Sequence, residues 1–126
     1  MTAVGEQLPE LVIDASVRNI VATAIASRDY QDVHHDVALA QERGSKTIFT
    51  NILTSNGYVL KYVTDWAGPQ SVVKTSSIRL GVPNYAGDVM TLRGEVTAVD
   101  GTRVTIAVRG SNSLGDHVIG TVGVEL

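Results

Sequence analysis

The chain has 126 residues, a length that suits one domain with one modest hydrophobic core. Its 10 basic and 13 acidic side chains leave a net charge of −3, and no run of lysines and arginines occurs, so nucleic acid is not an expected partner. Since the chain has no cysteine, its apolar runs are too short to span a bilayer and no signal peptide is recognisable, we expect a cytoplasmic protein without disulfides or thiolate metal sites.

The first half of the chain predicts a short strand followed by helices. Residues 8–15 (LPELVIDA) have the apolar content of a strand. Residues 16–26 space their apolar side chains at i, i+3, i+4, i+7 and i+8, as one face of an amphipathic helix requires, with Asp14 or Ser16 as the N-cap. Residues 36–44 predict a second, shorter helix that ends at a glycine.

Residues 49–69 contain conflicting signals. Asn56-Gly57 is a typical hairpin dipeptide, but the flanking residues do not alternate between apolar and polar. A helical stripe runs through the segment instead, formed by Ile52, Ser55, Val59, Tyr62, Val63 and Trp66. We therefore predict one long helix, largely buried, in which Gly57 is retained because another group approaches its backbone closely.

From residue 70 onward the apolar side chains follow the period of two that is typical of strands. Four blocks show this period, at residues 71–82, 88–100, 102–112 and 116–126. Asp100-Gly101 falls between the second and third blocks and predicts a tight hairpin. A long helix must bury an apolar face, and the sheet offers one. The expected fold class is therefore α+β, with an antiparallel sheet wrapped around a long central helix in a domain spanning residues 1–126.

The segment SRDYQDVHHD (27–36) carries three aspartates and two adjacent histidines directly after the first predicted helix. Asp29 and His34 are candidates for catalysis, because a carboxylate and an imidazole that share one water can orient it and transfer its proton. The simpler interpretation is a solvated loop, in which Asp32 forms a turn and Asp36 caps the following helix.

The two histidines also raise the question of a metal site. Adjacent histidines rarely reach the same ion. His117 is expected to lie far away in a strand, so the sequence offers no obvious third imidazole ligand. We therefore expect no metal, and we expect His35 to point away from His34, toward solvent or a supporting contact.

This order of elements, with an acidic segment ahead of the central helix, resembles the hot-dog fold of the MaoC-like (R)-specific enoyl-CoA hydratases. Their signature is Asp-x-Asn-Pro-(Leu/Ile)-His followed by x-Asp. Residues 29–36 (DYQDVHHD) keep its Asp, its His, the apolar residue before the His and the later Asp. The resemblance covers essentially the whole chain, which looks most like the small, single-hot-dog subunit of the heteromeric hydratases of actinobacterial steroid side-chain degradation.

The resemblance implies hydration of a trans-2-enoyl-CoA, with a steroid side-chain thioester as one candidate, to the (R)-3-hydroxyacyl-CoA. It implies Asp29 as the main base, His34 as its partner in orienting water, and the backbone N–H of Asn51 as donor to the thioester oxygen. CoA would enter as part of the substrate, without a separate cofactor, and a second MaoC-like hot-dog subunit would complete the pocket in a hetero-oligomer. The CoA phosphates demand positive charge, for which the candidates are Lys46, Lys74, Arg79 and Arg109.

Three departures from the family pattern leave other functions open. Arg28 replaces a small residue, Gln31-Asp32 replaces Asn-Pro, and Thr50-Asn51 replaces His-Gly. The loss of proline should loosen the turn between Asp29 and His34. The alternatives are a hot-dog acyl-CoA thioesterase and a non-catalytic subunit that completes a partner's pocket. The thioesterase is disfavoured because the central helix has only one carboxylate, Asp65, near its end.

Overall fold

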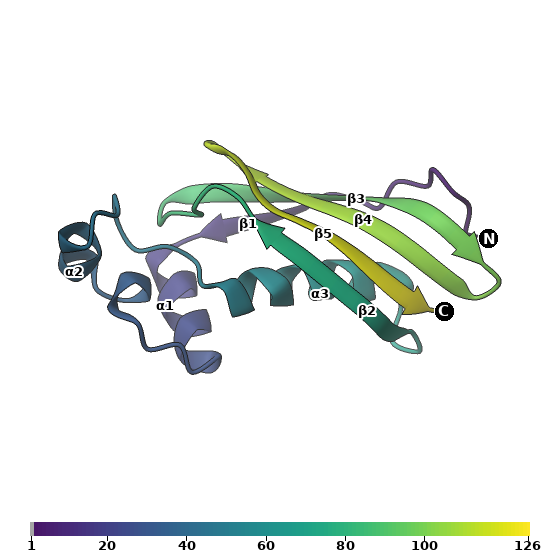
Figure 1. Ribbon diagram of the computed structural model, residues 1–126, viewed down its shortest axis with the longest axis horizontal. Coiled ribbons are helices and arrows are strands. Elements are labelled where there is room, and N and C mark those ends of the chain that lie inside the picture. The colour runs from purple at the N-terminus through teal and green to yellow at the C-terminus, as the bar shows by residue number, and fades with distance from the viewer. Residues whose placement is uncertain (1) are drawn as a thin grey trace.

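The computed structural model describes residues 2–126, which form a five-stranded antiparallel sheet with helices on one side (Figure 1). The strand order is β1-β3-β4-β5-β2, so β1 and β2 form the two edges. The elements in chain order are β1 (Leu11–Ala15), α1 (Val17–Ala26), the 3-10 turn η1 (Asp32–His34), α2 (Val37–Glu42), α3 (Ile52–Ala67), β2 (Val72–Leu80), β3 (Asp88–Asp100), β4 (Arg103–Asn112) and β5 (Gly115–Glu125). This is the predicted α+β arrangement. Within residues 2–126, none of the helices combines the length and the apolarity needed to cross a membrane.

The inner face of the sheet arises from alternation along its central strands. In β3 the side chains of Met90, Leu92 and Val96 are buried, whereas Arg93 and Glu95 between them are exposed. β4 repeats the pattern, and in β5 the buried valines include Val118, Val122 and Val124, so the three strands place a continuous apolar surface against α3. Each large apolar side chain contributes about 1.5–3 kcal/mol when it is fully buried. The four predicted strand blocks are confirmed to within two residues at each end.

The hairpin between β3 and β4 differs from the prediction by one residue. Asp100 pairs with Arg103, so the two turn residues are Gly101 and Thr102. Gly101 has φ +61, a left-handed conformation that glycine adopts without a steric penalty. The dipeptide marked the turn correctly, but only the register of the strands shows which residues lie in it.

α3 lies along the sheet but buries only one of its faces (Figure 1). The buried residues are Thr54, Ser55, Val59, Tyr62 and Val63. Leu53 and Gly57 on the other face are exposed, and Ile52, at the start of the predicted stripe, is exposed too, so the helix is less buried than predicted. Apart from its chain neighbours and the nearby backbone of α3, no atom of the described residues lies within 4 Å of where a Cβ on Gly57 would stand, so the expected close approach is also absent there. The sheet can cover only the side of the helix that faces it.

A second, smaller core lies where α1 and α2 gather at one end of the sheet (Figure 1). Its buried members are Ala15, Ile20, Ala40 and Ile48. Ser16 caps α1 by accepting from the N–H of Asn19 (3.1 Å), and Asp36 caps α2 by accepting from the N–H of Leu39 (3.0 Å). The segment 27–36 connects these two helices and lies against the start of α3.

Candidate active site

The backbone at the end of α1 sets the position of Asp29. The N–H of Arg28 donates to the carbonyl of Ile25 (3.0 Å), and the N–H of Asp29 donates to the carbonyl of Ala24 (2.9 Å). These are the two hydrogen bonds of a Schellman helix stop. Arg28 has φ +56, the left-handed conformation that favours glycine and costs about 1–3 kcal/mol for other residues. The sharp turn at Arg28 ends the helix stop, and Asp29 is the first residue after it.

His34 is held through its Nδ1 atom. The residue ends η1 and is buried. Nδ1 donates to the carbonyl of Phe49 (2.8 Å), and the Phe49 ring packs edge-on against the imidazole with centroids 4.9 Å apart. A carbonyl only accepts, so Nδ1 carries a proton. In the neutral ring Nε2 is therefore unprotonated, and it lies 3.4 Å from Oδ2 of Asp29.

The structure brings Asp29 and His34 together in one pocket of about 410 Å³ that opens to solvent. Its other lining residues are Gln31, Phe49, Thr50, Ile52, Leu80, Gly81, Val82, Pro83 and His117. The Asp29 side chain is 22% exposed and that of His34 is 7% exposed, so the carboxylate meets solvent while the imidazole is shielded. An unprotonated nitrogen and a carboxylate at this separation can both accept from one water, which would orient the water's oxygen into the pocket.

Asn51 is the N-cap residue of α3, between two pocket-lining residues, Thr50 and Ile52. Its side chain is engaged elsewhere, because Nδ2 donates to the hydroxyl of Ser27 (2.9 Å) and Oδ1 accepts from the hydroxyl of Thr54. Within the described residues, no group accepts from the backbone N–H of Asn51, and no side chain caps the first turn. The proposed backbone donor is thus available, and the partial positive charge of a 16-residue helix supports it.

His117 is the residue whose position the sequence pattern predicted wrongly. It belongs to β5 but lines the same pocket as Asp29 and His34. Its Nδ1 donates to the carbonyl of Val82 (2.7 Å), and its Nε2 accepts from the hydroxyl of Ser55 (2.7 Å). Burial lowers the pKa of His117, so the ring is neutral at pH 7. No local pattern signals this contact, because its three members come together only when the sheet pairs.

The other polar members of the segment 27–36 have structural contacts. His35 is exposed, and its Nε2 donates to the carbonyl of Tyr30 (3.2 Å). Asp36 is the predicted cap, and Asp32 begins η1 and forms an ion pair with Arg43. In the part of the chain that the structure describes, no three His, Cys, Asp or Glu side chains gather closely enough to hold a metal ion.

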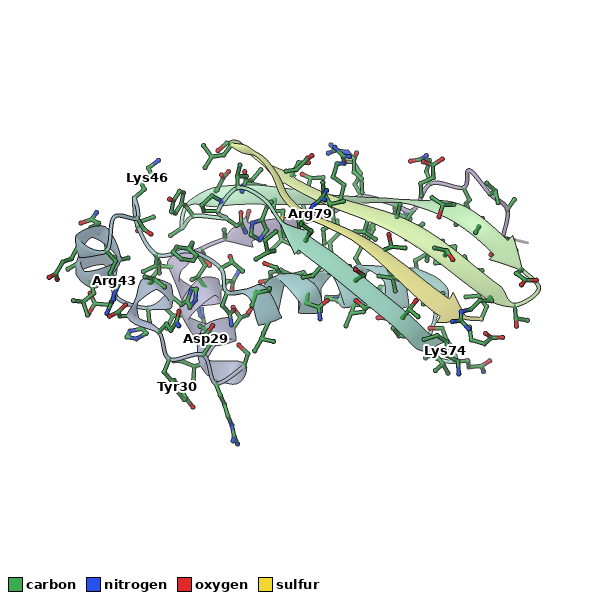
Figure 2. All side chains as sticks on the ribbon, in the orientation of Figure 1. Asp29, Tyr30, Arg43, Lys46, Lys74 and Arg79 are labelled. Carbon is green, nitrogen blue, oxygen red and sulfur yellow. The ribbon has the colours of Figure 1, made fainter. Side chains whose placement is uncertain are left out.

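The four candidate partners of the CoA phosphates differ in their surroundings. Arg109 donates to Asp116 (2.7 Å), so its charge is already paired. Figure 2 shows Lys74 at the end of the molecule opposite Asp29, Lys46 at the same end as Asp29, and Arg79 between them. Arg79 directly precedes a pocket-lining residue. Lys46 and Arg79 are therefore better placed than the other two to meet phosphates outside this pocket.

Known proteins show the same fold, although no family model matches the chain. The chain is 54% identical over all 126 residues, covering 98% of the relative, to the 3-oxo-4,17-pregnadiene-20-carboxyl-CoA hydratase beta subunit of Mycobacterium tuberculosis. It superimposes on a chain of the ChsH1-ChsH2 complex from Mycobacterium tuberculosis with a TM-score of 0.98 and 54% identity, over 100% of this chain and 99% of that one. An (R)-hydratase from A. caviae, involved in PHA biosynthesis, gives a TM-score of 0.87 with 23% identity over 99% of this chain and 97% of that one.

The match to the A. caviae enzyme concerns the fold alone, and it confirms the predicted hot-dog architecture. The match to the mycobacterial beta subunit extends over the whole chain at an identity far above what a shared fold requires. The chain therefore belongs to the MaoC-like hydratase family of the hot-dog fold, together with that beta subunit.

Proposed function

We propose that this chain is the small subunit of an (R)-specific enoyl-CoA hydratase, which adds water to a trans-2-enoyl-CoA. The observation that carries the proposal is the 3.4 Å separation of the Asp29 carboxylate and Nε2 of His34 in one pocket. The mycobacterial relative is named as a hydratase subunit, which supports the same activity.

Asp29 and His34 would act on one shared water. The water oxygen adds to C3 of the enoyl group, one water proton passes to the Asp29–His34 pair, and the pair returns a proton to C2, so water is the only co-reactant consumed. The Phe49 carbonyl accepts from Nδ1 and would stabilise an imidazolium while the proton is held. Negative charge develops on the thioester oxygen, and the N–H of Asn51 is the proposed donor to it. Addition from one face of the double bond would give only the (R)-3-hydroxyacyl-CoA.

The proposed substrate is a steroid side-chain enoyl-CoA, the class that the name of the relative gives. A pocket that opens to solvent, rather than a closed chamber, suits a bulky acyl group. CoA would enter as part of the substrate, no separate cofactor would take part, and the protein would be cytoplasmic.

A second MaoC-like hot-dog subunit is the proposed partner. β2 is an exposed edge of the sheet, and an edge strand offers unpaired N–H and C=O groups to another chain. Ile52 and Leu53, at the start of α3, are 54% and 55% exposed, so they offer apolar surface that a second subunit could cover. The similar chain in the ChsH1-ChsH2 structure occurs in a complex, which supports a hetero-oligomer.

The thioesterase alternative finds no support in the geometry. Asp65, the only carboxylate of α3, lies near the end of the helix, is exposed and contacts Lys61 at 2.5 Å. It does not line the pocket that holds Asp29 and His34. A non-catalytic subunit would have no need for the Asp29–His34 pair, and the experiment below separates it from the hydratase.

The test is an assay of the purified chain, alone and co-expressed with ChsH2 of Mycobacterium tuberculosis as a surrogate partner. Loss of the absorbance of the conjugated thioester is followed with crotonyl-CoA and with 3-oxo-4,17-pregnadiene-20-carboxyl-CoA. Chiral analysis of the crotonyl-CoA product determines its configuration, and sedimentation determines the assembly. We expect hydration by the complex and the (R) product.

Each alternative outcome has a distinct meaning. An (S) product would contradict the proposed delivery of water, and release of free CoA thiol without hydration would favour a thioesterase. A fully active homodimer would contradict the unlike partner. A complex that hydrates equally well with Asp29→Asn in this chain would show that this subunit is not the catalytic one.

A further inference from the structure

A bidentate ion pair closes the turn that carries His34. Nε and Nη2 of Arg43 lie 2.7 Å and 2.8 Å from Oδ1 and Oδ2 of Asp32. Paired contacts of this kind fix the relative orientation of both planar groups. The hydrogen bond from Arg43 lowers the pKa of Asp32, and the same contact raises the pKa of Arg43, so both groups stay charged at neutral pH.

The ion pair connects the beginning of η1 to the end of α2. Asp32 is the first residue of η1, and Arg43 is the C-cap of α2. Between them lie His34 and Asp36, the N-cap of α2. The carbonyl of Asp32 also accepts from the N–H groups of His35 (3.1 Å) and Asp36 (2.8 Å). The ion pair and these backbone hydrogen bonds therefore hold η1 and α2 in a fixed arrangement, and His34 is the last residue of η1.

Besides the ion pair, the stretch between Asp29 and His34 is restrained by separate hydrogen bonds. The carbonyl of Tyr30 accepts from Nε2 of His35 (3.2 Å), and the carbonyl of Val33 accepts from the N–H of Phe49 (3.2 Å). The N–H of Gln31 reaches Oδ1 of Asp29 only at 3.4 Å, and the N–H of His34 donates to the carbonyl of Gln31 (3.1 Å). Tyr30 and Gln31 are exposed. The sequence predicts a loose turn here, because Asp32 stands where the family has proline. The ion pair provides the restraint that a proline would otherwise provide.

Asp32 and Arg43 lie outside the pocket. They line a separate polar depression on the outer side of the turn, and neither lines the pocket of Asp29 and His34. Figure 2 shows Arg43 at the same end of the molecule as Asp29. We infer, on the basis of the proposed function, that Asp32 and Arg43 are positioning residues whose ion pair holds Nε2 of His34 within reach of the Asp29 carboxylate.

The backbone permits a direct test, because proline at position 32 should restore the restraint without the charge. Gln31 has φ −61 and ψ 137, an extended conformation that a residue before proline adopts. Asp32 occupies the first position of a helical turn, where proline is favoured. Within residues 2–126 the N–H of Asp32 donates to no group, so a proline ring there removes no hydrogen bond.

The experiment uses the full chain in complex with ChsH2 of Mycobacterium tuberculosis. The variants are Arg43→Gln, Asp32→Pro and the double variant. Arg93→Gln is the matched control, because Arg93 is an exposed arginine like Arg43 and contacts a carboxylate, that of Glu10, away from the pocket (2.9 Å). Amide hydrogen exchange of residues 29–36 measures the rigidity of the turn whether or not the enzyme is active. Values of kcat and KM with the steroid enoyl-CoA measure the alignment of the pair.

We expect Arg43→Gln to accelerate exchange in residues 29–36 and to lower kcat about 10- to 100-fold, because misplacement by about 1 Å has effects of this size. KM should change by much less, since neither residue contacts the pocket. The double variant should regain slow exchange and most of kcat, and Arg93→Gln should match the wild type.

Unchanged exchange in Arg43→Gln would overturn the inference, as would an equal loss of kcat in the single and double variants. A wild-type complex that hydrates no enoyl-CoA would instead refute the proposed function. In that case accelerated exchange in Arg43→Gln, restored by proline, still supports the role of the ion pair in holding the turn, and unchanged exchange still refutes it.

Discussion

His117 and Ser55 are joined by a 2.7 Å hydrogen bond between Nε2 and the serine hydroxyl, which connects β5 to the first turn of α3. The other ring nitrogen of His117 donates to the carbonyl of Val82, just beyond the end of β2. The neutral His117 side chain in β5 therefore connects the sheet to α3 and to the segment after β2 that lines the pocket. Protonation of Nε2 would remove the acceptor of the Ser55 hydroxyl and place a charge in a buried site.

The stability of the protein should therefore depend on pH through His117. Its folded-state pKa lies below the value of about 6.5 expected for the unfolded chain. The contribution is complete above pH about 6.5 and is lost as the pH falls toward the folded-state pKa, because there the unfolded state binds a proton that the folded state does not. Denaturant unfolding between about pH 8 and pH 5 should show the advantage of the wild type over His117→Asn shrinking as the pH falls. A constant difference would contradict this role.

Asparagine replacements test Asp29 and His34 separately from the packing around them. Asp29→Asn removes the charge at nearly constant shape. His34→Asn keeps a donor for the carbonyl of Phe49 and removes Nε2, whereas alanine would also leave that carbonyl unpaired. Each variant should lower kcat at least about 100-fold with little change in thermal midpoint. His35→Asn removes the adjacent imidazole outside the pocket and is the control. Turnover near that of the control in either site variant would refute the assignment.

The backbone N–H of Asn51 can be tested by comparing proline with alanine. Asn51 has φ −79, which proline can adopt, so Asn51→Pro removes the donor with little change of backbone. Asn51→Ala keeps the N–H donor but loses the side-chain contacts with Ser27 and Thr54. Asn51→Pro loses the same contacts, so the alanine variant measures the effect on stability that both substitutions share. We expect kcat to fall about 100- to 1,000-fold further in Asn51→Pro than in Asn51→Ala. Equal activities would exclude this N–H as the donor to the thioester oxygen.

Arg28→Gly should stabilise the chain by up to about 1 kcal/mol, because glycine relieves the left-handed strain, while its greater freedom in the unfolded state offsets part of the gain. Arg28 has φ +56, and the N–H groups of Arg28 and Asp29 form the two hydrogen bonds of the Schellman motif. Thermal and denaturant unfolding measure the change. The matched control is Arg18→Gly at the second residue of α1, where glycine should destabilise by up to about 1 kcal/mol. A loss of stability in Arg28→Gly similar to that of the control would contradict the strain.

Local pattern alone determined the elements of this protein. Alternation with a period of two identified β3, β4 and β5, and spacing with a period near four identified α1 and α3. The sequence was also sufficient to predict that Asp29 and His34 lie close together, because only one turn separates the two residues. These features depend on residues that are close together along the chain, so the local sequence is enough to predict them.

Tertiary structure decided which distant residues join the pocket and which surfaces stay uncovered. Ser55 and His117 are 62 positions apart, and they meet only because β5 pairs within the sheet that α3 covers. The exposure of Gly57 and Leu53 follows from the sheet's reaching only one side of the helix. The ion pair of Asp32 and Arg43 depends on the angle at which α2 leaves η1. Contacts between segments distant along the chain depend on strand register and packing geometry, which the local pattern of residues does not encode.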